Sequence, residues 1–168
     1  VEKSSFRLLW NSNGVFHPHG AAYPAIPAAN YSKMLVGDLQ NDRFDDIVVL
    51  GDKGSHLFNF ATNGLATDVS ALSRLSALSA MDGTLMDLDF TGKLDLIAVS
   101  NPTIQPSNHP TILRSEVRVY RQFGPLLFTD ITSTSGIPAS LHSAKAVMME
   151  DWNRDGKMDV IASRKERP

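Results

Sequence analysis

Three short runs of apolar residues dominate the hydrophobic pattern of this chain. They occupy residues 47–50, 96–99 and 160–162. Each run is apolar at consecutive positions, which is typical of a strand that is covered on both faces. Each run also follows directly on a polar stretch rich in aspartate. The pattern therefore predicts three buried strands, each entered from an acidic loop.

Alternating segments predict further strands. Residues 6–10 and 14–16 flank a turn at Gly14, and residues 117–121 and 124–128 repeat this arrangement around Gly124. Residues 57–60 and 64–65 form a more degenerate copy. Each copy predicts a hairpin of two outer strands joined by a glycine-containing turn.

Two connecting segments have patterns of their own. Residues 69–78 place Val69, Leu72, Leu75 and Leu78 at intervals of three. This period is compatible with a short helical turn, but we predict a plain connection between sheets. Residues 101–111 are polar and rich in proline, and they predict a long inserted loop.

The three acidic stretches share one spacing of oxygen-bearing side chains, at positions 1, 3, 5 and 9. These are Asp38, Gln40, Asp42 and Asp46; Asp87, Asp89, Thr91 and Asp95; and Asp151, Asn153, Asp155 and Asp159. Such spacing wraps a loop around one hard cation, with the backbone carbonyl of position 7 completing the shell. Position 7 is Phe44, Lys93 and Lys157.

The loops differ from EF-hands, which carry a bidentate glutamate at position 12. Position 12 here is Val49, Ala98 or Ala162, each within an apolar run. The alternative is that the loops are acidic β-turns without metal, since Asp and Asn favour turns. Turns do not require an acid at position 9, so the shared position-9 aspartate favours a metal. All-oxygen ligands favour Ca²⁺ over Mg²⁺.

Composition excludes several classes. The net charge of -2 argues against a nucleic-acid surface. The absence of cysteine excludes disulfides and zinc–thiolate sites. No apolar run approaches the roughly 18 residues that a membrane span requires. Fourteen of the acidic residues are aspartates and only four are glutamates, which favours turns and oxygen ligation over helices.

The loops and the strands after them resemble the FG-GAP or VCBS repeat of integrin-α-like β-propellers, over nearly the whole chain. The third loop matches the family pattern Asp-x-Asp/Asn-x-Asp-Gly-x-x-Asp in full. The second departs from it at Thr91, and the first departs at Gln40 and at Arg43, which replaces the turn glycine. A left-handed non-glycine residue costs about 1 kcal/mol, so we expect the first loop to be distorted or weak.

The resemblance implies an all-β fold: a partial β-propeller of antiparallel four-stranded blades with calcium-binding hairpin loops. The expected division is 1–32 as outer strands of a preceding blade, 33–80 as a blade, 81–140 as a blade with an inserted loop at 101–115, and 141–168 as half of a further blade. The spacing of the loops agrees with the roughly 40 to 50 residues of one propeller repeat, the second spacing being lengthened by the insertion. Residues 128–132, with Gly136 after them, resemble the family's blade ending.

Other candidate chemistry is sparse. His17 and His19 lack a third ligand and predict a surface loop, and the remaining histidines have no nucleophile motif beside them. Trp10 and Trp152 could stack on a sugar, but core packing is the commoner use. Residues 30–32 form a glycosylation acceptor, meaningful only in a eukaryotic secreted protein.

We therefore expect a non-catalytic calcium-binding module that binds a protein or glycan within a larger extracellular, periplasmic or cell-surface protein. The alternative is the propeller part of a polysaccharide lyase or hydrolase whose catalytic residues lie elsewhere. Extracellular modules often hold Ca²⁺ with a Kd of roughly 10⁻⁴ to 10⁻³ M, which motivates the location. A start without Met suggests a processed or excised piece. Since closed propellers use about four to eight blades, we expect further sequence or a second copy to complete the ring.

Overall fold

The computed structural model describes residues 9–18, 26–27, 29–62, 64–105, 112–138, 141 and 143–164. Strands predominate, and every pairing among them is antiparallel, so the expected all-β class is confirmed. The strands are β1 (Leu9–Ser12), β2 (Val15–Pro18), β3 (Tyr31–Gly37), β4 (Asp46–Gly51), β5 (His56–Phe60), β6 (Ala66–Asp68), β7 (Ala80–Met86), β8 (Asp95–Ser100), β9 (Thr103–Gln105), β10 (Ile112–Arg114), β11 (Val117–Gly124), β12 (Leu127–Asp130), β13 (Ala144–Glu150) and β14 (Asp159–Arg164).

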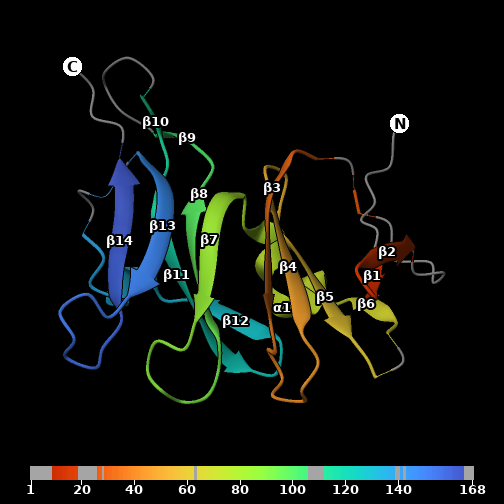
Figure 1. Cartoon of the computed structure of the whole chain (residues 1–168). Helices are drawn as coiled ribbons and strands as arrows, with labels where there is room; N and C mark the ends of the chain where they lie inside the picture. The colour runs from red at the N-terminus through yellow and green to blue at the C-terminus, as the bar shows by residue number, and fades with distance from the viewer. Residues whose placement is uncertain are drawn as a thin grey trace.

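Two four-stranded sheets form the centre of the molecule. Their strand orders are β3-β4-β5-β6 and β7-β8-β11-β12, so each sheet follows the chain from one edge to the other. A third unit, β13-β14, is two-stranded, as is the hairpin β1-β2. The first strands of the three units lie side by side, with β7 between β3 and β13 (Figure 1).

The first hairpins of the three units are copies of one another. In each, a bulge interrupts the ladder near the start of the first strand, at Ser32, Met81 and Lys145. A bulge adds one unpaired residue and strengthens the local twist. The shared position shows that the repeat extends from the acidic loops into the backbone of the strands before them.

The strand β8 is covered on both faces, as its apolar sequence predicts. Leu96 and Ala98 pack in the core between the two four-stranded sheets, whereas Ile97 and Val99 pack against β13 and β14. The strand β4 likewise directs alternate residues into two different cores. The third predicted strand differs, because Val160 and the two residues after it in β14 are only half-buried.

Two connections differ from their predictions. Residues 70–77 form a single α-helical turn, α1 (Ser70–Ser73), followed by the 3-10 helix η1 (Leu75–Ala77), where a plain connection was predicted. The helical turn closes because the backbone N–H of Ser73 donates to the carbonyl of Val69. The inserted segment is not wholly a loop, because β9 and β10 pair as a hairpin that projects from the second sheet (Figure 1). A further 3-10 helix, η2 (Thr132–Thr134), follows β12.

Candidate metal-binding loops

Each acidic loop joins the first two strands of one unit. The loops 38–46, 87–95 and 151–159 connect β3 to β4, β7 to β8 and β13 to β14, and they project from the same end of the molecule (Figure 1). The first two loops are in contact, because the Asn41 side-chain amide donates a 2.7 Å hydrogen bond to the carbonyl of Gly92. The structure thus places the sequence-predicted residues in three loops at one end of the molecule (Figure 1), and the first two of these loops are in contact.

The position-1 aspartate organises the turn in every loop. One carboxylate oxygen accepts a hydrogen bond from the backbone N–H of position 5, and the other accepts one from position 6. Burial alone would raise the pKa of Asp38, but the N–H groups of Arg43 and Asp42 outweigh it and hold the pKa below its ordinary value. The carboxylate is therefore kept ionised, as a cation ligand must be.

All three loops share a backbone in which positions 4 and 6 are left-handed. The φ angles are 58°, 57° and 59° at Asn41, Phe90 and Arg154, and 74°, 80° and 84° at Arg43, Gly92 and Gly156. The expectation that Arg43 distorts the first loop is therefore wrong. Arg43 adopts the glycine conformation, because the same pair of N–H groups is held by Asp38.

The position-9 aspartate fastens each loop to the sheet below it. Its Oδ2 accepts the N–H of position 2 in all three loops, at 3.1 to 3.3 Å. In the first two loops its Oδ1 also accepts a backbone N–H from the third strand, from Phe60 to Asp46 at 3.2 Å and from Gln122 to Asp95 at 2.7 Å. Sequence reasoning assigned these aspartates to a metal and missed this second partner, which only the sheet pairing supplies.

Burial accompanies these contacts. The exposed fraction of Asp46 is 0% and that of Asp95 is 2%, whereas Asp159 is half-buried. Desolvation raises the pKa of both buried carboxyls, although their N–H partners work in the opposite direction. The third loop consequently has the most accessible position-9 carboxylate.

The contacts at positions 3 and 5 distinguish the second loop from the first and the third. In the third loop, Asp155 accepts the N–H of Lys157 at 2.9 Å, and Asn153 Oδ1 accepts the N–H of Asp155 at 2.8 Å. In the second loop, Asp89 lies 3.3 Å from the guanidinium of Arg121. This guanidinium would compete with a metal ion for the Asp89 carboxylate. In the first loop, Asp42 accepts the N–H of Phe44 at 2.9 Å.

The predicted ligand positions of the loops carry oxygen-bearing side chains. Within the described residues, no group of three or more His, Cys, Asp and Glu side chains is positioned to hold a metal. The predicted ligands also include the amides of Gln40 and Asn153, the hydroxyl of Thr91 and the position-7 carbonyls. Such mixed oxygen shells suit Ca²⁺. The third loop fits best, because it alone has Asp or Asn at positions 1, 3, 5 and 9, and because its position-9 residue Asp159 is only half-buried.

The other candidate residues do not assemble a catalytic centre among the described residues. His17 lies exposed in strand β2 rather than in a loop, and His19, His109 and His142 lie outside the described residues. Trp152 is 75% exposed, so its predicted core packing is wrong; the side chain of Trp10 lies outside the description.

Sequence reasoning missed one polar cluster around His56. Ser70 Oγ lies 3.2 Å from His56 Nδ1, and Asp68 Oδ2 lies 3.8 Å from the same nitrogen. A catalytic triad places the serine and the acid on opposite ring nitrogens. Here Ser70 also accepts the N–H of Leu57 at 3.0 Å, so the cluster anchors α1 to β5.

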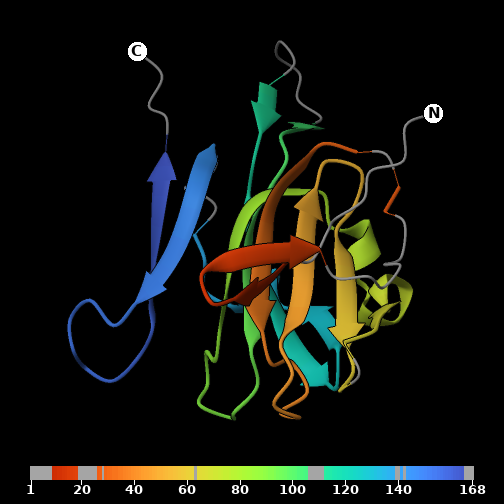
Figure 2. The ribbon, with the colours of Figure 1, turned by 45° about the vertical axis from the view of Figure 1, so that its right-hand side comes forward.

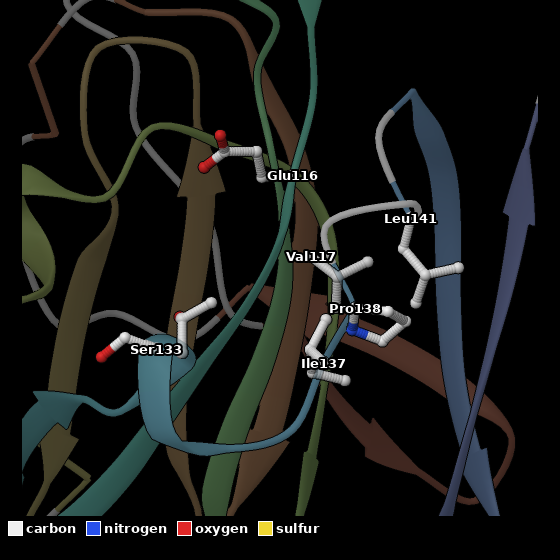
Figure 3. Close-up of a pocket in the computed structure, with 7 residues that line it drawn as sticks. Glu116, Val117, Ser133, Ile137, Pro138 and Leu141 are labelled. Carbon is white, nitrogen blue, oxygen red and sulfur yellow. The ribbon is translucent and has the colours of Figure 1, made fainter.

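A cavity of about 240 Å³ lies beside β11, lined by Glu116, Val117, Thr132, Ser133, Ile137, Pro138 and Leu141. Figure 3 shows four of these, Val117, Ile137, Pro138 and Leu141, gathered at one side, away from Glu116 and Ser133. The carboxylate of Glu116 forms an ion pair with Arg118 at 3.0 Å. The lining therefore combines part of the apolar core with one paired charge and offers no nucleophile–base pair.

No protein-family model, curated protein or solved structure matches the chain. None of the helices among the described residues is long and apolar enough to cross a membrane.

Proposed function

We propose that the chain is a non-catalytic, calcium-stabilised β-propeller module that binds a protein or glycan outside the cell. The observation that carries the proposal is the threefold recurrence of one loop, with the same two left-handed positions and the same aspartate-to-backbone hydrogen bonds. All three loops also keep an acid at position 9, where it both accepts the N–H of position 2 and would supply a ligand oxygen.

The arrangement of the sheets supports the propeller part of the proposal. Each four-stranded sheet follows the chain in order, and the first strands of successive units lie next to one another. In a propeller, blades are four-stranded sheets arranged around a common axis. The two complete sheets would be neighbouring blades, and β13-β14 would be the inner half of the next.

In the third loop, Asp151, Asn153, Asp155 and Asp159 would hold the ion with the carbonyl of Lys157. A bound Ca²⁺ supplies positive charge that offsets the repulsion among the loop carboxylates. The residues themselves already set the loop's shape, because Asp151 restrains the N–H groups of Asp155 and Gly156 at 3.0 and 2.9 Å. The role of the ion is therefore structural, and it would fasten the hairpin that it closes.

Titration calorimetry with CaCl₂ tests the proposal. We expect binding to two or three sites, with the tightest site lost in Asp155→Asn. Glu150→Gln is the matched control, because Glu150 is an exposed acid just before the third loop and carries no ligand position. An absence of binding by the unmodified chain, or an equal loss in both variants, would contradict the metal assignment.

The extracellular location follows from the expected affinity. Loops with Gln40, Thr91 or Arg43 in place of the family residues should bind weakly, and sites with a Kd of roughly 10⁻⁴ to 10⁻³ M fill only where calcium is abundant. Fractionation of the source cells would test this, and recovery of the protein from the cytosol would contradict it.

A further inference from the structure

Among the described residues, the strand β14 has one edge without a paired strand, where β4 and β8 have a partner. The strands β4 and β8 each lie between two neighbours, whereas among the described residues β14 pairs with β13 alone. All of β8 is buried, but the first four residues of β14 are only half-buried. Exposed edges of this kind invite pairing with another strand.

Asp159 shows what the free edge lacks. In the first two loops, Oδ1 of the position-9 aspartate accepts an N–H from the third strand, at Phe60 or Gln122. In the third loop, the described residues provide Asp159 with the N–H of Trp152 on Oδ2 and with no corresponding donor on Oδ1. A third strand beside β14 would complete the same arrangement.

The hairpin β1-β2 matches the strands that fill this position in the other sheets. Asn11 pairs with Phe16, as Phe60 pairs with Ala66 in β5-β6 and Gln122 with Phe128 in β11-β12. Leu9 pairs with Pro18 in the place where Phe58 pairs with Asp68 and Tyr120 with Asp130. The ladder of the hairpin can therefore be aligned with the two outer-strand pairs, with a connection that is shorter by one residue.

Three apolar side chains of the hairpin are exposed to solvent. Leu9, Val15 and Phe16 are 50%, 56% and 64% exposed, whereas Phe58 and Phe128, the counterparts of Leu9 and Phe16, are 0% and 1% exposed. Among the described residues, β1 and β2 pair only with each other. The hairpin thus has the pairing of an outer pair without the sheet that normally buries it.

The hairpin and the unpaired edge of β14 lie apart within one molecule. In Figures 1 and 2, β1-β2 lies on the side of the first sheet, and β14 lies at the opposite end of the row of units. We propose that the free edge of β14 docks the β1-β2 hairpin of a second copy of this chain, head to tail.

The register of the docked strand follows from the other two sheets. Phe58 lies opposite Ile47, and Tyr120 lies opposite Leu96. By the same register, Leu9 of one copy lies opposite Val160 of the next, and the N–H of Asn11 donates to Oδ1 of Asp159. A head-to-tail contact of this kind closes into a ring or extends into a chain of copies.

Cysteine cross-linking tests both the contact and its register, since the chain has no cysteine of its own. Directly opposite residues of antiparallel strands have Cα atoms roughly 4.5 to 5.5 Å apart, within disulfide range. We expect the double variant Leu9→Cys, Val160→Cys to form covalent multimers on oxidation that dissolve on reduction. The matched control is Leu9→Cys, Ile161→Cys, in which a one-residue slip turns the second thiol to the other face, and we expect it to cross-link poorly.

Light scattering of the unmodified chain provides a readout that needs no variant. We expect the molar mass to exceed that of one chain and to rise with concentration until any ring closes. A monomer at every concentration would overturn the proposal. Cross-linking at equal yield in the two double variants, or association without cross-linking at positions 9 and 160, would overturn it as well. Calcium titration of the same samples tests the proposed function separately, because a chain that stays monomeric can still bind calcium.

Discussion

At the scale of single residues, the acidic loops depend on two left-handed positions that most side chains avoid. Position 6 is Gly92 or Gly156 in two loops and Arg43 in the first, at φ angles between 74° and 84°. The loop tolerates arginine because the carboxylate of Asp38 accepts the N–H groups of Asp42 and of Arg43 itself. The local fold is thus preserved at the expense of added backbone strain at Arg43.

This strain predicts opposite effects for a pair of substitutions. Arg43→Gly should raise the free energy of unfolding by up to about 1 kcal/mol, because it relieves a left-handed non-glycine residue. Gly156→Ala should lower it by about 1 kcal/mol, and since no atom lies within 4 Å of the added Cβ, the cost is conformational alone. Urea denaturation of both variants measures the difference. Effects of the same sign would contradict the strain at Arg43.

At the scale of elements, Asp82 joins the first strands of all three units. Its carboxylate lies 2.7 Å from Lys33 Nζ on β3 and accepts the N–H of Val147 on β13 at 2.8 Å. Burial alone would raise the pKa of Asp82, but these two contacts outweigh it and lower the pKa. The ionised carboxylate therefore stabilises the row of strands.

Replacing this carboxylate should change the pH dependence of stability. The folded pKa lies below the unfolded value, so the stabilisation is complete above the unfolded pKa of about 4 and is lost as pH falls through the folded pKa. At neutral pH we expect Asp82→Asn to lower the free energy of unfolding by about 1 to 2 kcal/mol, a difference that narrows in acid. Denaturation from pH 7 downward measures it. The exposed control Glu150→Gln should change stability by no more than about 0.5 kcal/mol.

The packing of β7 between neighbouring elements requires a glycine. A Cβ at Gly83 would lie 2.8 Å from the carbonyl oxygen of Ile97 and 3.0 Å from Leu50 Cδ1. We expect Gly83→Ala to lower the free energy of unfolding by about 1 to 3 kcal/mol. Gly124→Ala is the control, because no atom lies within 4 Å of its added Cβ. Equal stability of the two variants in urea would show that the sheets adjust freely.

At the scale of the whole molecule, two hydrophobic cores lie between successive units, and each contains residues from both of the units that flank it. Leu96 and Ile97 are neighbours in β8, yet they pack into different clusters on the two sides of the second sheet. Each unit is therefore stabilised chiefly by its neighbours, as expected of repeat architectures. Loosening one hairpin should weaken the adjoining core as well.

Calcium should consequently raise the melting temperature of the whole chain. At a hundredfold excess over Kd, one site that binds only the native state adds about 2.7 kcal/mol, which corresponds to about 5 to 10 °C for a chain of this size. We expect chelator to reverse the shift and Asp151→Asn to reduce it. Calorimetric melting curves that coincide with calcium and with chelator would contradict a stabilising role for the ion.

Local chemistry explains what the sequence by itself determined. Aspartate spacing and turn preferences act within nine residues, so the three loops and the strands after them could be located without a structure. The run of consecutive apolar residues at 96–99 likewise predicts burial on both faces of the strand. Alternation and turn residues predict the outer hairpins around Gly14 and Gly124, and β1-β2 and β11-β12 confirm the two pairings over the described residues. The second turn differs from its prediction, because Gly124 is the last residue of β11 and the turn lies at residues 125–126.

Only the tertiary structure decided which strand lies beside which edge. The second partners of Asp46 and Asp95 come from strands far along the chain, and the half-burial of β14 depends on an edge with no neighbour among the described residues. The cluster of His56, Asp68 and Ser70 and the hairpin β9-β10 within the insertion also escaped prediction. These features depend on pairing between separated segments of the chain. The entropic cost of that pairing and the packing that offsets it cannot be read from a short stretch of sequence.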